Sequence, residues 1–566
     1  MSCDSLDNTR RYRRIISLFV VGLVIASICA QQSCADEQKP NVLILMADDL
    51  GFSDLGCYGS EIATPVLDAL ASTGIVFSNF HTAPTCSPTR AMLLTGVDHH
   101  RAGMGNMYEF LASAPAQIGS PGYEGHLNDS VVTIAEVLRT VGYHTAISGK
   151  WHLGRRLVLT QAPVGRGFDQ SWVLWSGWAE HYAPAYPRTF VEGKNRSPYP
   201  RGRYSTELYT DKAIEFADRA IDNNKPFFLF ASYTAPHWPL EAPADLIAKQ
   251  KGKYDAGYDE LRKRRIAGLV EKGILAKDTP VAATPARRPQ LHHQLPTEET
   301  RKWEELDSDE RVYSARLMEV HAAMIESLDQ HVGRLLKHLR VRDQLNNTLI
   351  IFLSDNGAAP MASTPTAPGN RLENVGRPGS FVGYGPEWAR ASTGPLRLMK
   401  GYATEGGTRV PAIIKLPDSN QHRVTAEFAS VLDIAPTIYE LTGATYPKTF
   451  GDHDLNGLNG VSMVPYITGA RDRIHELDYS MGWELFGRTA FRHGKWKITW
   501  IENPFGSSVF ELFDIESDPG ESRDVRAMHP EIYRQMVDGF EEYARINGIV
   551  IARPRHWSVG ETANER

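Results

Sequence analysis

Cysteine is scarce in this sequence, and neither sign of charge is in large surplus. Only 5 of the 566 residues are cysteine, which excludes the disulfide-rich class of small secreted proteins. The 61 basic and 67 acidic residues leave a net charge of −6, and neither sign forms a long run. A nucleic-acid-binding protein would show a basic surplus or stripe, so we expect no nucleic-acid partner.

A hydrophobic run long enough to span a membrane is also missing. Apolar residues fill positions 15–30, after arginines at 10, 11, 13 and 14 and before the polar segment QQSCADEQKP. That order is typical of a secretory signal peptide, and its apolar part is shorter than the ~20 residues of a spanning helix. We expect residues 1–35 to be a signal peptide cleaved after Ala30 or Ala35. The mature protein would be exported, periplasmic or secreted, with no stable membrane span, and both Sec and twin-arginine export stay open.

Cleavage of the signal peptide would leave two cysteines, Cys57 and Cys86. They could form one disulfide or be two small buried side chains, or Cys86 could be retained for its chemistry. Cys86 opens the segment CSPTRAMLLTG, where Pro88 suits the first turn of a helix and Gly96 its end. The N-terminus of a helix favours an anionic ligand, and Arg90 lies one turn further on the same side.

Four short apolar runs, each stopping abruptly in polar residues, predict the fold. Runs of this kind are typical of buried parallel strands, and amphipathic helical stretches separate them. The pattern predicts a doubly wound α/β fold with ligands at the carboxyl ends of the strands. The runs occupy residues 41–51, 143–154, 227–239 and 347–357.

Changes in composition along the chain suggest the domain organisation. We expect a catalytic α/β domain over 38–445 and a smaller C-terminal α+β domain over 470–566 with an antiparallel sheet. Two polar segments, at about 241–312 and 361–394, are read as insertions, the first with a charged amphipathic helix. They could shape access of a substrate or be solvated segments without a role.

Carboxylate and amide side chains follow two of the four runs. Asp48 and Asp49 end the first, and Asp355 and Asn356 end the fourth. Such residues often cap helices or turns, but three carboxylates at one sheet edge repel one another unless a cation lies among them. An all-oxygen set suits Ca²⁺ or Mg²⁺.

Basic and imidazole groups follow the other two runs. Lys150 and His152 are two apart, so an extended segment would project them from one face; His237 ends the third run, and Lys400 precedes a Gly-Gly turn. Each alone could be a solvated lysine or a structural histidine, but together they predict a pocket for an oxyanion. The residues thus indicate a hydrolase of oxyanion esters, and a thiolate nucleophile stays open.

The segment CSPTR fits C-x-P-x-R, and with its companion motifs the chain resembles the type I sulfatases of the alkaline phosphatase superfamily. The insertions are most similar to those of bacterial arylsulfatases. The resemblance implies an alkaline phosphatase-like fold with a mixed, mainly parallel sheet. The companion motifs, in the family's order, are ADDLG, LLTG, GKWHLG, APHWP, SDNG and EGGTRVP.

The same resemblance implies roles for the residues singled out above. A maturation enzyme would oxidise Cys86 to Cα-formylglycine, whose hydrated form, acidified by Ca²⁺ and Arg90, attacks the sulfur of a small-molecule or glycan sulfate ester. His237 or Lys400 would assist departure of the alcohol, and His152 would remove the second proton of the diol. The single Ca²⁺ would be held by Asp48, Asp49, Asp355, Asn356 and the modified Cys86, and the sulfate oxygens by Lys150, His237 and Lys400.

Hydrolysis of an aryl sulfate is the function we expect, and other readings stay open. The same core could serve a carbohydrate sulfatase or a phosphonate or phosphate ester hydrolase. A non-catalytic binder of sulfated glycans would be expected to have lost part of this set, and a two-zinc phosphodiesterase would need additional histidines. We expect His81, His99 and His100 to be structural.

Overall fold

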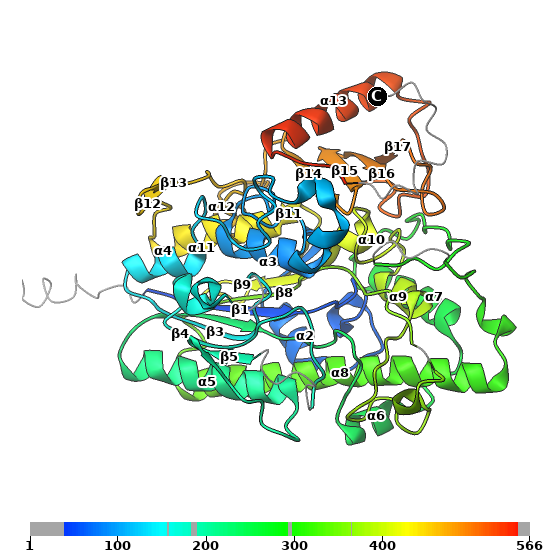
Figure 1. The fold of residues 1–566 in the computed structure, drawn as a ribbon, viewed down its shortest axis with the longest axis horizontal. Helices are drawn as coiled ribbons and strands as arrows, with labels where there is room; N and C mark the ends of the chain where they lie inside the picture. Colours follow the sequence, from blue (N-terminus) through cyan, green and yellow to red (C-terminus); the bar gives the residue numbers. More distant parts are fainter. Residues whose placement is uncertain (1–38, 155–157, 183–189, 292–296, 364, 553–566) are drawn as a thin grey trace, which may run out of the picture. The chain divides into compact units, whose positions relative to one another are not determined.

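The computed structural model describes residues 39–154, 158–182, 190–291, 297–363 and 365–552 (Figure 1). The predicted signal peptide, with Cys3, Cys29 and Cys34, lies outside the described residues, as do the last residues of the predicted C-terminal domain, 553–566.

A large mixed sheet forms the centre of the fold. Its strands lie in the order β10-β2-β9-β8-β1-β7-β3-β4-β5-β6, with β11 beside β2. The strands are β1 (Asn41–Ala47), β2 (Ile75–His81), β3 (His144–Lys150), β4 (Gln170–Leu174), β5 (Phe190–Glu192), β6 (Asn195–Arg196), β7 (Phe227–Ser232), β8 (Thr348–Ser354), β9 (Arg409–Lys415), β10 (Arg423–Thr425) and β11 (Ala429–Ser430).

The four apolar runs of the sequence are β1, β3, β7 and β8, which lie side by side in the order β8-β1-β7-β3. All three pairings among them are parallel, whereas β9 pairs antiparallel with β2 and β8. The mixed, mainly parallel sheet is therefore confirmed. Because the four strands run the same way, the polar residues after them meet at one edge.

Helices cover both faces of the sheet, above and below it in Figure 1. Leu43 and Leu45 of β1 pack in one core with three of these helices, whereas Val42, Ile44 and Met46 pack in another with three more. Burial on both sides explains why the strands are continuously apolar. The first core contains α2 (Pro65–Ala71), α5 (Ser205–Asp222) and α8 (Ser308–Val341), and the second α3 (Cys86–Thr95), α4 (Ile134–Thr140) and α11 (Ile434–Thr442).

The two predicted insertions contact one another. The first contains α6 (Ala244–Gln250) and α7 (Tyr258–Glu271), where the sequence predicted one charged helix; Gly252 and Gly257, both at positive φ, separate the two. The second contains α9 (Pro386–Thr393). Arg390 of α9 pairs with Asp259 of α7 at 2.6 Å, so the two insertions are joined to one another.

The C-terminal part contains the predicted antiparallel sheet. Helix α13 packs on this sheet through Met536 and Phe540, which share a core with Phe491, Ile498 and Leu512. The short elements α10 (Glu405–Thr408), β12 (Thr449–Phe450), β13 (His453–Asp454) and α12 (Val464–Ile467) precede the C-terminal sheet in the chain. The C-terminal strands, in order, are β14 (Ser480–Leu485), β15 (Arg488–His493), β16 (Trp496–Trp500) and β17 (Phe510–Asp514), followed by α13 (Pro530–Ile546).

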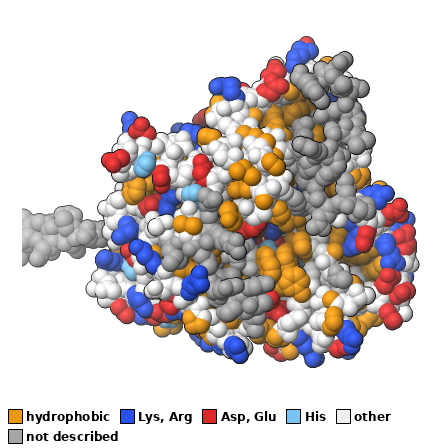
Figure 2. Space-filling model, in the orientation of Figure 1, with side chains coloured by type: hydrophobic (Ala, Val, Ile, Leu, Met, Phe, Trp, Pro, Cys, Tyr) orange, Lys and Arg blue, Asp and Glu red, His pale blue; other side chains and the backbone are white. Residues whose placement is uncertain are grey.

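Hydrophobic side chains gather near the middle of the face drawn in Figure 2, and charged side chains lie mainly toward its edges. Among the helices that the structure describes, none combines the length and apolarity needed to cross a membrane.

Candidate active site

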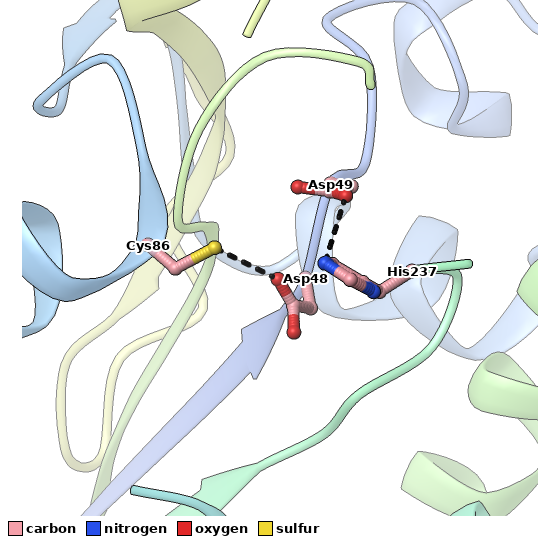
Figure 3. Close-up of side chains that lie close together, drawn as sticks. All are labelled: Asp48, Asp49, Cys86 and His237. Carbon is pink, nitrogen blue, oxygen red and sulfur yellow. Dashed lines mark hydrogen bonds and ion pairs between the residues drawn. The ribbon is translucent and has the colours of Figure 1, made fainter. Parts of the chain in front are cut away.

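The carboxyl ends of the central strands bring the predicted residues together. Asp48 and Asp49 follow β1, and Cys86 and His237 approach them from α3 and from the loop after β7 (Figure 3). One side-chain ligand atom from each of these four residues lies within 4.8 Å of those of the others. The Cys86 Sγ lies 3.6 Å from Asp48 Oδ1, and His237 Nε2 lies 3.5 Å from Asp49 Oδ2.

The residues after β8 complete this group. Asn356 Nδ2 donates to Asp49 Oδ1 at 2.7 Å, and the backbone N–H of Asp49 donates to Asp355 Oδ1 at 3.2 Å. Asp49 adopts φ 68°, a left-handed conformation that turns the chain sharply as it leaves β1. Asp48, Asp49, Asp355 and Asn356 are all buried.

The oxygen atoms of this group fit a hard cation. Asp49 Oδ2 and Asn356 Oδ1 are buried and accept no hydrogen bond, which is costly unless another partner binds them. Burial and the Asp48 carboxylate raise the pKa of Asp355, a repulsion that a cation would relieve. Carboxylate and amide oxygens are ligands of Ca²⁺ and Mg²⁺, so Asp48, Asp49, Asp355 and Asn356 are suited to hold one.

Cys86 is the first residue of α3, and its side chain is almost fully buried. Thr85 precedes the helix in an extended conformation, and Gly96 ends it at φ 67°, as the sequence predicted. Burial raises the pKa of the Cys86 thiol to about 12. An unmodified cysteine here would therefore stay protonated near neutral pH and be a poor nucleophile.

Arg90 lies one turn beyond Cys86 and is held from three sides. Its guanidinium donates to Asp355 Oδ2 at 2.9 Å, to Ser232 Oγ at 2.5 Å and to the backbone carbonyl of Lys150 at 3.1 Å. Burial alone would lower the pKa of Arg90, but Asp355 and Asp48 raise it. A fixed positive charge thus lies beside the first turn of α3.

Two lysines pair with the carboxylates of the same group. Lys150 Nζ donates to Asp48 Oδ2 at 2.7 Å, and Lys400 Nζ donates to Asp49 Oδ1 at 2.5 Å. Burial alone would lower the pKa of each lysine, but Asp48 raises that of Lys150 and Asp49 raises that of Lys400. Both lysines are therefore charged near neutral pH.

The two predicted histidines differ in their surroundings. Burial holds the pKa of His237 well below its usual range, and its Nδ1 lies 2.5 Å from the carbonyl of Trp238. His152 lies beyond the end of β3 at φ 57°, so the extended segment predicted for Lys150 and His152 is wrong at His152. Its Nε2 lies 3.0 Å from Glu109 Oε1, and its buried Nδ1 has no hydrogen-bond partner.

Sequence reasoning missed two side chains of the site. Ser232 ends β7 and bridges Arg90 to the Lys150 carbonyl, to which it donates at 2.7 Å; a polar residue closing an apolar run was the available signal. Glu109, which orients His152, lies in the short 3-10 helix Tyr108–Ser113, which no sequence pattern predicted.

The three remaining histidines near α3 make hydrogen bonds away from the cation group. His81 contacts Glu405, His99 contacts the Met104 carbonyl, and His100 contacts Asp98 and Glu484. Asp98, His99 and His100 lie close enough for a metal, but both ring nitrogens of His100 already face carboxylates.

Comparison with known proteins identifies the family. The family model described as Sulfatase matches residues 40–444. The chain is 37% identical over 544 residues to an uncharacterised sulfatase of Schizosaccharomyces pombe, covering 92% of this chain and 96% of the relative. It is also 37% identical over 447 residues to an arylsulfatase of Klebsiella aerogenes, covering 76% and 92%.

A solved structure shares the fold. The crystal structure of Ps i-CgsB superimposes with a TM-score of 0.64 at 24% identity, covering 93% of this chain and 100% of that one. Together with the match over most of the chain, these similarities show that the protein belongs to the sulfatase family, whose members hydrolyse sulfate esters.

Proposed function

We propose that this sulfatase is an exported arylsulfatase that works through a Cα-formylglycine made from Cys86 and a bound Ca²⁺. The 37% identity to the Klebsiella arylsulfatase supports the aryl specificity. The all-oxygen group of Asp48, Asp49, Asp355 and Asn356 supports Ca²⁺.

The position of Cys86 carries this proposal. Its side chain lies beside Asp48 at the N-terminus of α3, within reach of Arg90 and both lysines, yet burial raises the pKa of its thiol to about 12. The Cys86 thiol is a poor nucleophile although it lies at the centre of the site. Conversion of this cysteine to formylglycine would explain its position. When present, the hydrated aldehyde supplies the attacking oxygen, and Ca²⁺ lowers the pKa of that oxygen.

The chain's own residues position the ester. Lys150 and Lys400 offer charged N–H donors to the sulfate oxygens, and His237 lies beside them. Their preorganised charges stabilise negative charge that develops on the sulfate. Lys400 or His237 assists departure of the phenol.

His152 accepts the proton released at residue 86. Burial lowers its pKa, so the ring is neutral near pH 7. The Glu109 carboxylate accepts from Nε2–H, which fixes the tautomer with a lone pair on the partnerless Nδ1. That nitrogen is the base of the site.

Conversion of Cys86 has to precede folding. Every residue of α3, from Cys86 to Thr95, is buried, so a maturation enzyme cannot reach the thiol once α3 has packed. Purified, folded protein that carries the thiol should resist conversion by a formylglycine-generating enzyme, whereas the same protein treated while unfolded should be converted. Equal conversion of both forms would contradict this.

A substrate panel tests the aryl assignment. Protein co-expressed with a formylglycine-generating enzyme is assayed with 4-nitrophenyl sulfate, phenyl phosphonate monoester and a sulfated monosaccharide. We expect the highest kcat/KM for the aryl sulfate. Comparable rates on the phosphonate would show a phosphonate hydrolase, and preference for the sugar would show a carbohydrate sulfatase.

Export rests on the leader at residues 1–35. N-terminal sequencing of protein recovered from outside the host cytoplasm is expected to begin at residue 31 or 36, after Ala30 or Ala35. An intact N-terminus on active protein inside the cytoplasm would contradict the proposal.

A further inference from the structure

A large cavity beside the site is lined mainly by the two insertions. Its volume is about 1230 Å³, above the ~300–1,000 Å³ of ordinary small-molecule pockets. We call it the insertion pocket. An ion pair, Arg390 with Asp259, and a hydrogen bond from Arg265 to Ser392 join α7 and α9, so contacts between the insertions hold the walls together.

Some residues that line the insertion pocket lie close in sequence to the catalytic residues. Trp238 directly follows His237, and Pro360 and Met361 continue the loop that begins at Asp355 and Asn356. These walls place the pocket next to the groups proposed to bind sulfate.

Two further residues that line the pocket lie close to the partner of His152 and to the residue after Lys400. Phe110 follows Glu109, the partner of His152. Leu291 packs closely on Gly401, the residue after Lys400, where an added Cβ would meet the Leu291 carbonyl at 2.8 Å. The pocket therefore adjoins the site through residues that follow β7 and β8 and through these two contacts, and this is where we place the alcohol part of the sulfate ester.

Some of the exposed apolar side chains of the described residues lie at this pocket. Val312 and Leu372 line it and are 54% and 41% exposed. At its edge, the ring of Trp238 lies 5.2 Å from that of Phe381 and 4.9 Å from that of Trp178, and Phe381 is 46% exposed. Apolar surface left open around a cavity marks a binding site for an apolar group, and aromatic rings favour a ring-shaped one.

The described lining residues carry an excess of negative charge. Five carboxylates face two guanidinium groups, which leaves a net charge of −3. The two arginines are already paired, Arg288 with Glu298 at 2.6 Å and Arg301 with Glu310 at 2.6 Å. The carboxylates are those of Glu298, Glu299, Asp309, Glu310 and Glu387.

We propose that the insertion pocket binds the alcohol part of the ester and selects an uncharged, apolar alcohol of more than one ring over an anionic one such as a polysulfated glycan. The proposal rests on the function proposed above, because it concerns the ester cleaved at residue 86. Like charges repel the anionic alcohol, and the size of the cavity leaves space beyond a single ring.

Two naphthyl sulfates that differ by one anionic sulfonate group test the selection. The pair is 2-naphthyl sulfate and its 6-sulfonate derivative, and phenyl sulfate is the one-ring reference. We expect KM to be at least about tenfold lower for 2-naphthyl sulfate than for either of the others, with similar kcat. Equal KM values, or a lower KM for the sulfonate, would overturn the proposal.

Variants that remove negative charge test whether the carboxylates of the insertion pocket cause the difference in KM. Glu299→Gln with Asp309→Asn removes two negative charges from the pocket and should narrow the difference between the naphthyl substrates several-fold. The control, Glu531→Gln with Asp538→Asn, makes the same change on exposed positions of α13 and should leave the difference intact. If both double variants behave alike, the insertion pocket is not the source of selection.

Binding of the free alcohols separates this proposal from the catalytic one. Calorimetric titration of the Cys86→Ala protein with 2-naphthol and with 6-hydroxynaphthalene-2-sulfonate requires no turnover. Binding of 2-naphthol that is at least about tenfold tighter, and weakened by Phe381→Ser, supports the pocket even if no ester is hydrolysed. Absence of 2-naphthol binding overturns the pocket even if aryl sulfates are turned over.

Discussion

At the scale of single residues, the site depends on hydrogen bonds that hold Arg90 in place. Ser232 Oγ accepts from Arg90 and donates to the Lys150 carbonyl, so one hydroxyl links β7 to Arg90 of α3 and to the end of β3. Arg90 keeps Asp355 as a partner without it. We therefore expect the main role of the hydroxyl to be the positioning of the Arg90 guanidinium.

Ser232→Ala should lower kcat for an aryl sulfate by about tenfold to a hundredfold, because partners of this kind orient the groups that touch substrate. The measurement is steady-state kinetics on protein of equal aldehyde content. Ser148→Ala is the control, since Ser148 is buried in β3 and donates to the Tyr209 carbonyl away from the site. Both variants should lose about 1 kcal/mol of stability, and an equal kcat in both would contradict the positioning role.

Residue types and spacing predicted most of the site but not its hydrogen-bond partners. Asp48, Asp49, Asp355 and Asn356 were predictable because they end strands that had to be parallel. Glu109 was not predictable, because its pairing with His152 joins residues 43 positions apart and depends on where the short 3-10 helix Tyr108–Ser113 packs. The left-handed conformation of His152 was not predictable either, since no glycine or turn motif marks it.

At the scale of elements, the cation site proposed at the strand ends should contribute to stability as well as to activity. Treatment with a chelator should abolish hydrolysis of aryl sulfate and lower Tm, because three neighbouring carboxylates lose their counter-charge. Added Ca²⁺ should restore both at lower concentration than Mg²⁺. Full activity in the presence of excess chelator, or restoration by Mg²⁺ alone, would contradict a calcium site.

The segment after α3 is tied to the C-terminal sheet through His100. Its ring lies 2.9 Å from Asp98 and 3.2 Å from Glu484 of β14. Burial alone would lower its pKa, but these two carboxylates raise it to about 9. The folded state therefore binds a proton more tightly than the unfolded state, in which the pKa is near 6.5.

Stability should fall as pH rises from 6.5 to 9, by roughly 3 kcal/mol or about 3 °C in Tm for this single group. The contribution is complete below pH 6.5 and is lost as pH passes through the folded-state pKa. His100→Gln should be less stable at pH 6.5 and should show a smaller fall up to pH 9. An identical pH profile of Tm for both proteins would show that His100 does not carry the effect.

At the scale of the whole molecule, the sequence predicted four buried strands and the helices between them, because both faces of the central sheet are covered. Continuous apolar runs such as that of β1 are visible in a sequence, as is the antiparallel C-terminal sheet. The insertion pocket was not visible, because its walls come from Phe110, Trp238 and segments far apart in the chain. Its apolar and acidic character emerges only when the two insertions meet.

The scarcity of cysteine and the position of Cys86 lead to the central claim, that turnover depends on conversion of this residue to formylglycine. Preparations with different extents of conversion are made by varying co-expression of a formylglycine-generating enzyme, and the mass of the peptide carrying residue 86 gives the aldehyde fraction of each. The rate of aryl sulfate hydrolysis should be proportional to that fraction and absent in Cys86→Ala. A rate that does not change with the aldehyde fraction, or that survives in Cys86→Ala, would contradict the account.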